Sequence, residues 1–317
     1  MSEQGARFTL WGIEVFVAVA DEGSVSLAAR RLGASPSAVS QQITNLESAL
    51  GTVLMDRSAR PVVLTPAGQM FRRRAQAILN EAAQARVELT LSDLSRLTDF
   101  RLGVIEDFDA EVTPRLLAQM AETLKDCQFL LETGASHRLL DALDNRALDV
   151  VVAADMGAAA DWMEVHPLME EPFVVAVPKG QGGSAEELRL LPLIQYTERH
   201  HMGRQIAAHL ARHNLRLAHR FELDSYHAIM AMVAEGAGWT ILTPLGALHA
   251  HRFRDRTQIL PLPFAPMTRT ISLTARRGVL GEMPEATANR LRGLLKAFVV
   301  DPAVARLPWL EGKLRLL

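Results

Sequence analysis

The sequence predicts an α/β protein with an N-terminal winged helix-turn-helix followed by two α/β lobes. Residues 24–45 read as two short helices about a tight turn, and residues 71–89 carry a narrow apolar seam at helical spacing. After about residue 100, strand-like runs alternate with amphipathic helical stretches, which is typical of α/β folds. At 317 residues, the chain is long enough for two or three domains.

The tight turn is encoded on both sides. Ser24 is a good N-cap for the first short helix, and Gly33 ends that helix because glycine readily adopts the left-handed conformation. Ser35 is placed to cap the second helix, and Pro36 stands at its first position, where no backbone N–H is needed. The pattern therefore predicts a helical pair with a sharp corner.

The second short helix has two contrasting faces. One face is an apolar stripe made of Val39, Ile43, Leu46 and Leu50. The other face carries uncharged hydrogen-bonding residues, namely Ser37, Ser40, Gln41, Thr44 and Asn45. Such side chains can donate and accept at base edges in the major groove of DNA. We expect a DNA-reading helix; the alternative is a helical hairpin with a neutral solvent face.

Residues 53–65 read as two β-rich runs about a basic, proline-marked tip, which is typical of a hairpin wing. We expect Arg57 and Arg60 near this tip to reach phosphates or the minor groove. Thr65 as N-cap and Pro66 at the first helical position then begin another helix.

That helix carries an apolar seam in alternating steps of four and three residues: Phe71, Ala75, Ile78, Ala82, Ala85 and Leu89. A seam of this heptad type favours pairing with a second copy of the same helix. The alternative is a seam buried against its own domain, which the small alanines also allow. The sequence predicts pairing through the seam.

Residues 8–68 resemble the DNA-binding region of LysR-type transcriptional regulators. The matching positions are Phe16, Ala20, Ser24, Ala28, Ala29, Leu32, Ser40, Gln42, Ile43, Leu46, Glu47, Leu50, Gly51, Leu54, Arg57, Leu64, Thr65, Ala67 and Gly68. Two positions depart from the family: Met55 replaces a usual phenylalanine, and Gln41 stands where arginine is frequent. The resemblance implies a dimer or tetramer on a partly palindromic operator. From the helix face, its caps and the wing tip, we expect these residues at the DNA: Ser24, Ser35, Pro36, Ser37, Ser40, Gln41, Arg57 and Arg60.

The rest of the chain alternates strand-like and helical segments. The expected strands are 100–105, 129–132, 148–153, 173–177, 193–196, 220–223 and 271–275. The expected helices are 114–124, 137–145, 202–213, one from about 225, and a closing helix over 285–299. Two α/β lobes joined by two crossing strands suit a hinged ligand trap.

The family resemblance extends more weakly into these lobes, at 148–149, 172–178 and 233–244. It implies an effector-binding domain that is similar to periplasmic solute-binding proteins, in which a small molecule alters the DNA-bound dimer or tetramer. We expect a DNA-binding domain over 1–65, a linker helix over 66–94 and an effector-binding domain over 95–317. Lobe I would hold about 95–172 and 268–317, and lobe II about 178–267.

Loops after the strands locate the expected cleft. Its candidate residues are Glu106, Asp107, Phe108, Ala135, Ser136, Tyr196, Thr197, His200, Asp224, Ser225 and Gly238. We expect Ser136, Thr197 and Ser225 to donate hydroxyl groups to a ligand. Glu106 and Asp107 either cap the helix that follows or face the cleft, where they would repel anions and select a neutral or cationic effector. Gly238 equally suits a tight turn with no ligand contact.

Histidines concentrate in the expected lobe II. His209 and His213 have the i, i+4 spacing of a metal pair, but the sequence names no third ligand, so surface histidines are the simpler interpretation and no metal is expected. His200 and His201 follow a cleft loop, where they could donate to an effector or sense pH.

Composition excludes several classes of protein. No phosphate loop, dinucleotide fingerprint or catalytic motif occurs, so neither an enzyme nor a cofactor is expected. The single cysteine, Cys127, excludes an internal disulfide, and a net charge of −2 argues against indiscriminate nucleic-acid binding. With no apolar run long enough for a membrane and no signal-peptide pattern, we expect a cytoplasmic protein.

The expected function is therefore a ligand-responsive transcription factor. Its expected partners are operator DNA, a second copy of the chain and a small-molecule effector, with RNA polymerase as a further candidate. The alternative is a regulator with no effector, either architectural or constitutive.

Overall fold

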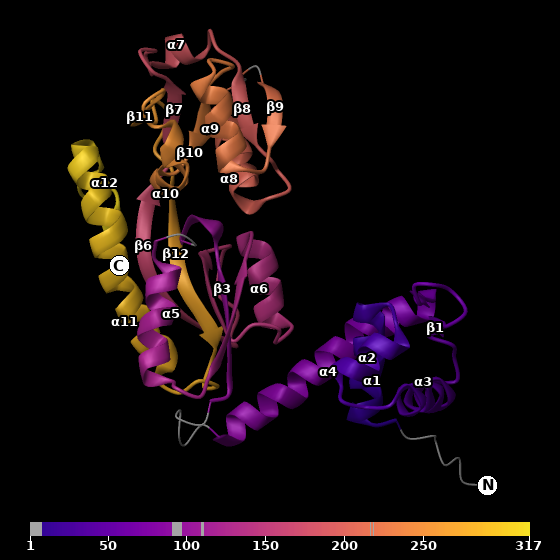
Figure 1. Ribbon diagram of the computed structural model, residues 1–317. Coiled ribbons are helices and arrows are strands. Elements are labelled where there is room, and N and C mark those ends of the chain that lie inside the picture. The colour runs from indigo at the N-terminus through magenta and orange to yellow at the C-terminus, as the bar shows by residue number, and fades with distance from the viewer. Residues whose placement is uncertain (1–7, 91–96, 109–110, 216, 218) are drawn as a thin grey trace. The chain divides into compact units, whose positions relative to one another are not determined.

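The computed structural model describes residues 8–90, 97–108, 111–215, 217 and 219–317. The chain divides into two compact units (Figure 1): the first consists of Met1–Leu89 with Asn145–Ala147, and the second of Thr90–Asp144 with Leu148–Leu317. No helix among the described residues has the length and apolar character needed to cross a membrane.

The first unit is a winged helix-turn-helix followed by a long helix. Its elements are α1 (Leu10–Glu22), α2 (Val25–Arg31), α3 (Pro36–Leu50), β1 (Met55–Asp56), β2 (Val63–Leu64) and α4 (Pro66–Thr90). The strands β1 and β2 pair antiparallel and form the wing. This confirms the fold predicted for residues 24–65.

Side-chain caps set the corner between α2 and α3, as the sequence predicts. The Ser24 hydroxyl accepts from the backbone N–H of Leu27 at 3.4 Å, and the Ser35 hydroxyl accepts from that of Ala38 at 3.2 Å. Gly33 has φ +63°, the left-handed conformation that glycine adopts without strain.

The core of the first unit packs the three short helices against the wing. Phe16, Ile43, Leu54 and Met55 are at most 2% exposed. The methionine that stands in place of the family's usual phenylalanine therefore lies in this core. A Cβ atom on Gly68 would lie 2.0 Å from the carbonyl oxygen of Leu54, closer than any real contact. Only glycine lets the first turn of α4 approach the backbone of the wing.

The beginning of α4 belongs to this core. The ring of Phe71 meets that of Phe16 edge to face at 5.1 Å between centroids, and Ala75 is fully buried. Ile78 and Leu79 also pack against the same cluster. Within one chain Ala75 is buried and Phe71 and Ile78 are half-buried against this cluster, an arrangement that favours the alternative interpretation for this half of the seam, while pairing with a second copy stays a prediction.

The second unit begins with a mixed six-stranded sheet in the order β13-β6-β12-β5-β3-β4. Lobe I is this sheet with its helices. Its elements are β3 (Asp99–Val104), η2 (Glu106–Phe108), α5 (Thr113–Thr123), β4 (Gln128–Thr133), α6 (Ser136–Asp144), β5 (Val150–Ala154), β6 (Met163–Pro172), β12 (Thr268–Arg276), α11 (Met283–Leu295), η4 (Lys296–Val300), α12 (Asp301–Arg306), η5 (Pro308–Leu310) and β13 (Arg315–Leu316). β5 is buried along its whole length and pairs parallel with β3, as its continuous apolar run predicts.

Lobe II holds two smaller sheets, β10-β7-β11 and β8-β9. Its elements are β7 (Val174–Pro178), α7 (Ala185–Leu188), β8 (Leu193–Tyr196), α8 (His201–Arg212), β9 (His219–Leu223), α9 (Tyr226–Ala234), β10 (Thr240–Leu242), α10 (Pro244–His249), η3 (His251–Phe253) and β11 (Thr257–Pro261). A parallel bridge between Leu193 and Trp239 joins the two sheets.

The chain crosses between the lobes twice. It leaves the sheet of lobe I with β6, passes Phe173 and enters lobe II with β7; it returns from β11 into β12. In Figure 1, β6 and β12 run side by side below lobe II, and their antiparallel pairing extends from Thr268↔Pro172 to Arg276↔Met163. These two paired strands form the crossing between the lobes that the sequence predicts. The sequence pattern predicts no strand over residues 163–172, so β6 is found only in the structure.

Candidate functional site

The exposed face of α3 presents the residues expected to read DNA. Ser37, Gln41, Thr44 and Asn45 are exposed, and Ser40 is half-buried. The Gln41 side-chain amide donates to the Asn45 carbonyl oxygen at 2.9 Å, so the two amides form a preformed pair one helical turn apart. Such a pair offers both donors and acceptors to a base edge.

Glu47 is a buried residue that the sequence reading did not assign to the site. One carboxylate oxygen accepts from the backbone N–H groups of Leu54 and Met55 at 2.8 and 3.2 Å. The other accepts from the Arg57 guanidinium at 2.9 Å. Glu47 thus fixes the start of the wing to α3. In the sequence, the only sign of this role is that Glu47 matches the family pattern.

The two basic wing residues are placed differently. Arg57 is occupied within the domain, because it contacts Glu47 and also donates to the Thr44 hydroxyl at 3.1 Å, beside the predicted reading face. Arg60 is exposed, and its guanidinium donates to the carbonyl oxygens of Arg57 and Ala59 at 2.9 and 3.0 Å. Arg57 therefore has the geometry of a residue that positions the wing, and Arg60 that of a surface cation.

In the second unit, a cavity of about 50 Å³ lies between the lobes at the crossing strands. Six of the predicted cleft residues line it: Glu106, Asp107, Ala135, Ser136, Tyr196 and His200. Helix starts bring them together, since η2 begins at Glu106, α6 at Ser136 and α8 directly after His200. The Ser136 hydroxyl accepts from the backbone N–H of Ala154 at 3.2 Å, which ties α6 to the end of β5.

The other five predicted residues do not line the cavity. Phe108 is buried in the core, and Asp224 is exposed. The Thr197 hydroxyl donates to the Glu222 carboxylate at 2.6 Å, and the Ser225 hydroxyl caps α9. Gly238 occupies a tight turn, where a Cβ atom would lie 2.2 Å from the Pro192 carbonyl oxygen. In this structure the two hydroxyl groups make contacts within lobe II, and Gly238 follows the tight-turn alternative, so none of the three lines the cavity.

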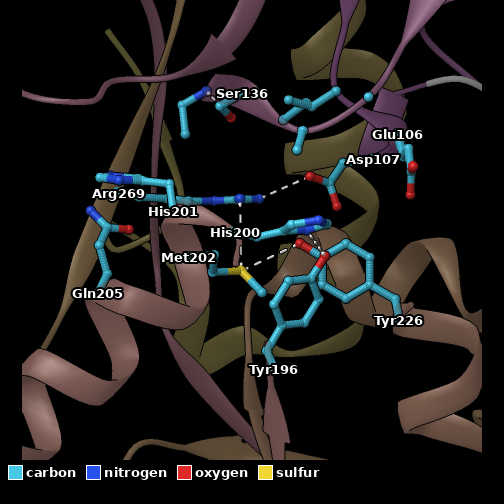
Figure 2. A pocket seen from close by; sticks show the side chains of 14 residues that line it. Glu106, Asp107, Ser136, Tyr196, His200, His201, Met202, Gln205, Tyr226 and Arg269 are labelled. Carbon is cyan, nitrogen blue, oxygen red and sulfur yellow. Dashed lines mark hydrogen bonds and ion pairs between the residues drawn. The ribbon is translucent and has the colours of Figure 1, made fainter. Parts of the chain in front are cut away.

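The cavity also contains residues from later segments that the sequence reading did not assign to the cleft. These residues are Arg269, Met202, Gln205 and Tyr226 (Figure 2). His201, which the sequence places after a cleft loop, lines the cavity as well. Arg269 comes from β12, more than a hundred residues after Glu106. No local pattern marks it, because a single arginine in a strand has no distinctive spacing.

Arg269 forms the electrostatic centre of the cavity wall. Its guanidinium lies 3.0 Å from the Asp107 carboxylate and 2.6 Å from that of Glu171, and all three side chains are at most 5% exposed. It also donates to the Thr243 hydroxyl at 3.2 Å. Asp107 is therefore an ion-pair partner facing the cavity, and α5 begins without any side-chain cap.

The carboxylates determine the charge of this centre. Burial alone would lower the pKa of Arg269, but Glu171, Tyr226 and Asp107 together raise it well above its usual value, so the guanidinium is charged. Burial raises the pKa of Glu171, and the charge of Arg269 opposes this shift. Burial lowers the pKa values of His200 and His201, so both rings are neutral at pH 7.

Two further histidines, His209 and His213, have the spacing of a metal pair in the sequence. His209 is buried, which corrects its expected surface position, and its ring centroid lies 4.7 Å from that of His213, with the two rings tilted by 57°. Among the residues that the structure describes, no three His, Cys, Asp or Glu side chains are placed to hold a metal ion.

Two family models match the chain. "Bacterial regulatory helix-turn-helix protein, lysR family" matches residues 10–69, and "LysR substrate binding domain" matches residues 95–298. A winged helix-turn-helix followed by a two-lobed effector domain defines a ligand-responsive DNA-binding regulator of transcription. The chain belongs to the LysR family of bacterial transcriptional regulators.

Individual relatives agree with this assignment. A "Probable hydrogen peroxide-inducible genes activator" of Mycobacterium avium is 32% identical over 285 residues, covering 87% of this chain and 90% of the relative. The "DNA-binding transcriptional dual regulator OxyR" of Escherichia coli K12 is 26% identical, covering 84% and 88%.

Solved structures show the same fold. Full-length OxyR of Pseudomonas aeruginosa, in a cysteine variant, has a TM-score of 0.66 at 24% identity and covers 90% of this chain and 95% of its own. The LysR-family regulator CbnR has a TM-score of 0.64 at 18% identity, covering 90% and 99%.

Proposed function

We propose that this regulator binds a partly palindromic operator as a homodimer or homotetramer, and that a small molecule in the cavity between the lobes changes its DNA-bound state. The observation that supports this proposal is the position of Arg269. It lies on a crossing strand, pairs with Asp107 of lobe I, and donates to Thr243 at the start of α10 in lobe II. A ligand that touches this centre would bias how the lobes close.

Glu171 extends the same connection. It lies on β6, the other crossing strand, and accepts from the backbone N–H of Leu245 in lobe II at 3.1 Å and from Arg269 at 2.7 Å. Both crossing strands therefore carry one member of a buried network that reaches into each lobe. Because buried charges tolerate few geometries, this network favours discrete arrangements of the lobes over a continuous range.

Self-association would use the second half of α4. Among the α4 side chains that the structure describes, Leu79 is the last apolar one that packs against the core of its own domain. Of the remaining seam positions, Ala82 is half-buried and Ala85 is exposed, whereas the side chain of Leu89 lies outside the described residues. We propose that this half of the helix pairs with its copy, because small residues at heptad spacing allow two helices to approach closely.

The proposed signal is noncovalent binding. Several relatives are named for a response to hydrogen peroxide, and one solved neighbour is titled as bound to it. Here the only cysteine is Cys127, which lies before β4 and does not line the cavity. Burial raises the pKa of its thiol to about 11, so little reactive thiolate is present at pH 7. A single cysteine also provides no intramolecular disulfide.

An operator screen tests the proposal. Genomic fragments retained by the full-length protein would be sequenced, and fluorescence anisotropy on a retained fragment would be repeated with a library of small metabolites. We expect at least one metabolite to change operator affinity and raise the melting temperature by mass action. A protein that retains specific fragments but responds to no metabolite would instead support a regulator without an effector.

Hydrogen peroxide is the matched control for that screen. We expect no change in operator binding after peroxide treatment of the native protein, and the same behaviour for Cys127→Ser. A peroxide response that is lost in Cys127→Ser would contradict noncovalent sensing.

A further inference from the structure

A second cavity, of about 310 Å³, lies between lobe II and the C-terminal segment, and we call it the α12 cavity. One wall comes from α9, α10 and β11, and the other comes from α12 and η5, which lie beyond residue 298, where the family model ends. Figure 1 shows α12 beside this part of lobe II. The volume falls in the range of small-molecule sites, about 300–1,000 Å³. The α12 cavity shares no lining residue with the cavity around Arg269.

Apolar side chains form the floor of the α12 cavity. Met230 of α9, Ala303 of α12 and Leu310 of η5 are at most 1% exposed. Leu260 of β11 and Trp309 of η5 are half-buried in the same lining. An apolar body that covers this floor removes its surface from water, and that burial favours binding.

The edge of the α12 cavity is basic. Arg254 and Arg306 line it and are exposed, whereas no acidic side chain of the described residues lines it. Arg306 has no hydrogen-bond or ion-pair partner within the part of the chain that the structure describes, and Arg254 lies 3.7 Å from an oxygen of Asp255. The acidic residues closest in sequence to these walls are all exposed and lie outside the lining: Asp255, Asp301 and Glu311. The local charge therefore favours an anion over a cation.

The α12 cavity and the cavity around Arg269 are connected by α10. Three residues of this helix line the α12 cavity: Pro244, Ala247 and Leu248. At the start of the same helix, the backbone N–H of Leu245 donates to Glu171 at 3.1 Å, and the hydroxyl of Thr243 accepts from Arg269 at 3.2 Å. A ligand in the α12 cavity would therefore contact the helix that the buried network holds.

We propose that the α12 cavity is a second ligand site, which binds a monocarboxylic acid with an apolar body as its carboxylate. The apolar body covers the floor, and the carboxylate meets Arg254 and Arg306 at the edge. Guanidinium groups present paired N–H donors that match the two oxygens of a carboxylate. A neutral apolar ligand would leave these donors unused, and an ammonium ligand would be repelled. The site is separate from the proposed effector cavity and does not depend on it.

Trp309 provides a local readout. It lines the α12 cavity, whereas the other three tryptophans lie elsewhere in the chain: Trp11, Trp162 and Trp239. The full-length protein would be labelled with 5-fluorotryptophan, and Trp309→Phe would assign the fluorine signal. Sodium octanoate is the probe at pH 7.5. Octylammonium chloride has the same chain with a positive head, and sodium acetate has the same head without the chain.

We expect octanoate to shift the Trp309 signal saturably, and octylammonium and acetate at the same concentrations to leave it unchanged. Arg306→Gln should weaken octanoate binding about tenfold, because the carboxylate loses a charged donor. Arg254→Gln should weaken it in the same direction. Arg212→Gln makes the same chemical change at an exposed position of α8 outside the cavity and should leave the affinity unchanged.

Three results would overturn the proposal. The first is the absence of a saturable Trp309 shift with octanoate. The second is an equal affinity for octylammonium or for acetate, because the basic edge or the apolar floor would then have no part in selection. The third is an octanoate affinity that is unchanged in both Arg254→Gln and Arg306→Gln. Because both arginines are exposed, these substitutions leave the core intact, and the signals of Trp162 and Trp239 would verify the native fold of each variant.

Discussion

Arg269 and Asp107 form a buried ion pair in the wall of the cavity, with 3.0 Å between the guanidinium and the carboxylate. Arg269 belongs to a crossing strand and Asp107 to the short helix that follows the first strand of lobe I. Because Glu171 contacts the same guanidinium, removal of Arg269 would leave two carboxylates buried without their cation.

The first prediction concerns the stability of the second unit. Arg269→Met should lower its free energy of unfolding by about 3–5 kcal/mol, because two carboxylates remain buried without a partner. Urea unfolding followed by tryptophan fluorescence would measure the loss. Arg277→Met replaces an exposed arginine on the turn after β12 and should cost less than about 1 kcal/mol. Similar losses in both variants would show that the buried pair contributes nothing specific.

The second prediction concerns pH. Burial lowers the pKa of folded His201 below its ordinary value of 6.5, and Arg204, Arg269 and His137 lower it further. As the pH falls below 6.5, the unfolded chain therefore binds the proton first, and stability that is complete above pH 6.5 declines toward the lower folded pKa. His201→Gln should make the decline of unfolding free energy between pH 7 and 5 shallower.

Urea unfolding at several pH values would test this, with His251→Gln as a control for loss of an exposed imidazole. An identical pH dependence in native protein and His201→Gln would contradict a depressed pKa at this position.

The third prediction concerns base reading by α3. Gln41→Ala should weaken binding to the true operator by about 1–3 kcal/mol and weaken binding to random DNA much less. Arg60→Ala should instead weaken binding to all sequences and reduce the salt dependence by about one unit per subunit if it meets a phosphate. Anisotropy titrations over a range of salt concentrations would measure both. If Gln41→Ala weakened binding to the operator and to random DNA equally, Gln41 would not contribute to sequence specificity.

The fourth prediction concerns self-association. Ala85→Glu places a charge on the exposed part of the seam and should shift sedimentation toward the monomer, with little effect on the unfolding free energy of the monomer itself. Phe71→Ala should have the opposite profile, with a loss of about 3–5 kcal/mol in stability, because its ring packs on Phe16 in the core. If Ala85→Glu remains an oligomer and binds operator normally, assembly depends on another surface.

Sequence periodicity accounts for most of the local structure. The caps at Ser24 and Ser35, the turn at Gly33 and the buried strand β5 all follow from patterns within a few residues of one another. The spacing of the α4 seam does not distinguish between two partners, because it suits both a second helix and the core of its own domain. At Phe71 and Ala75 the tertiary packing supplies the core of the domain as the partner, because α1 places Phe16 against the same face of α4.

The sequence by itself determined the helix-turn-helix, the wing, the alternating lobes and six of the residues that line the cavity, because short-range capping, helical spacing and strand-like runs encode them. Tertiary structure alone decided the centre of that cavity. Arg269 reaches Asp107 across 162 positions of the chain, and Glu171 joins it from the paired crossing strand. Pairing of β6 with β12 creates this juxtaposition, and no spacing within either segment carries it. The same pairing determines that Asp107 binds a cation, whereas its place beside a helix start suggested a cap.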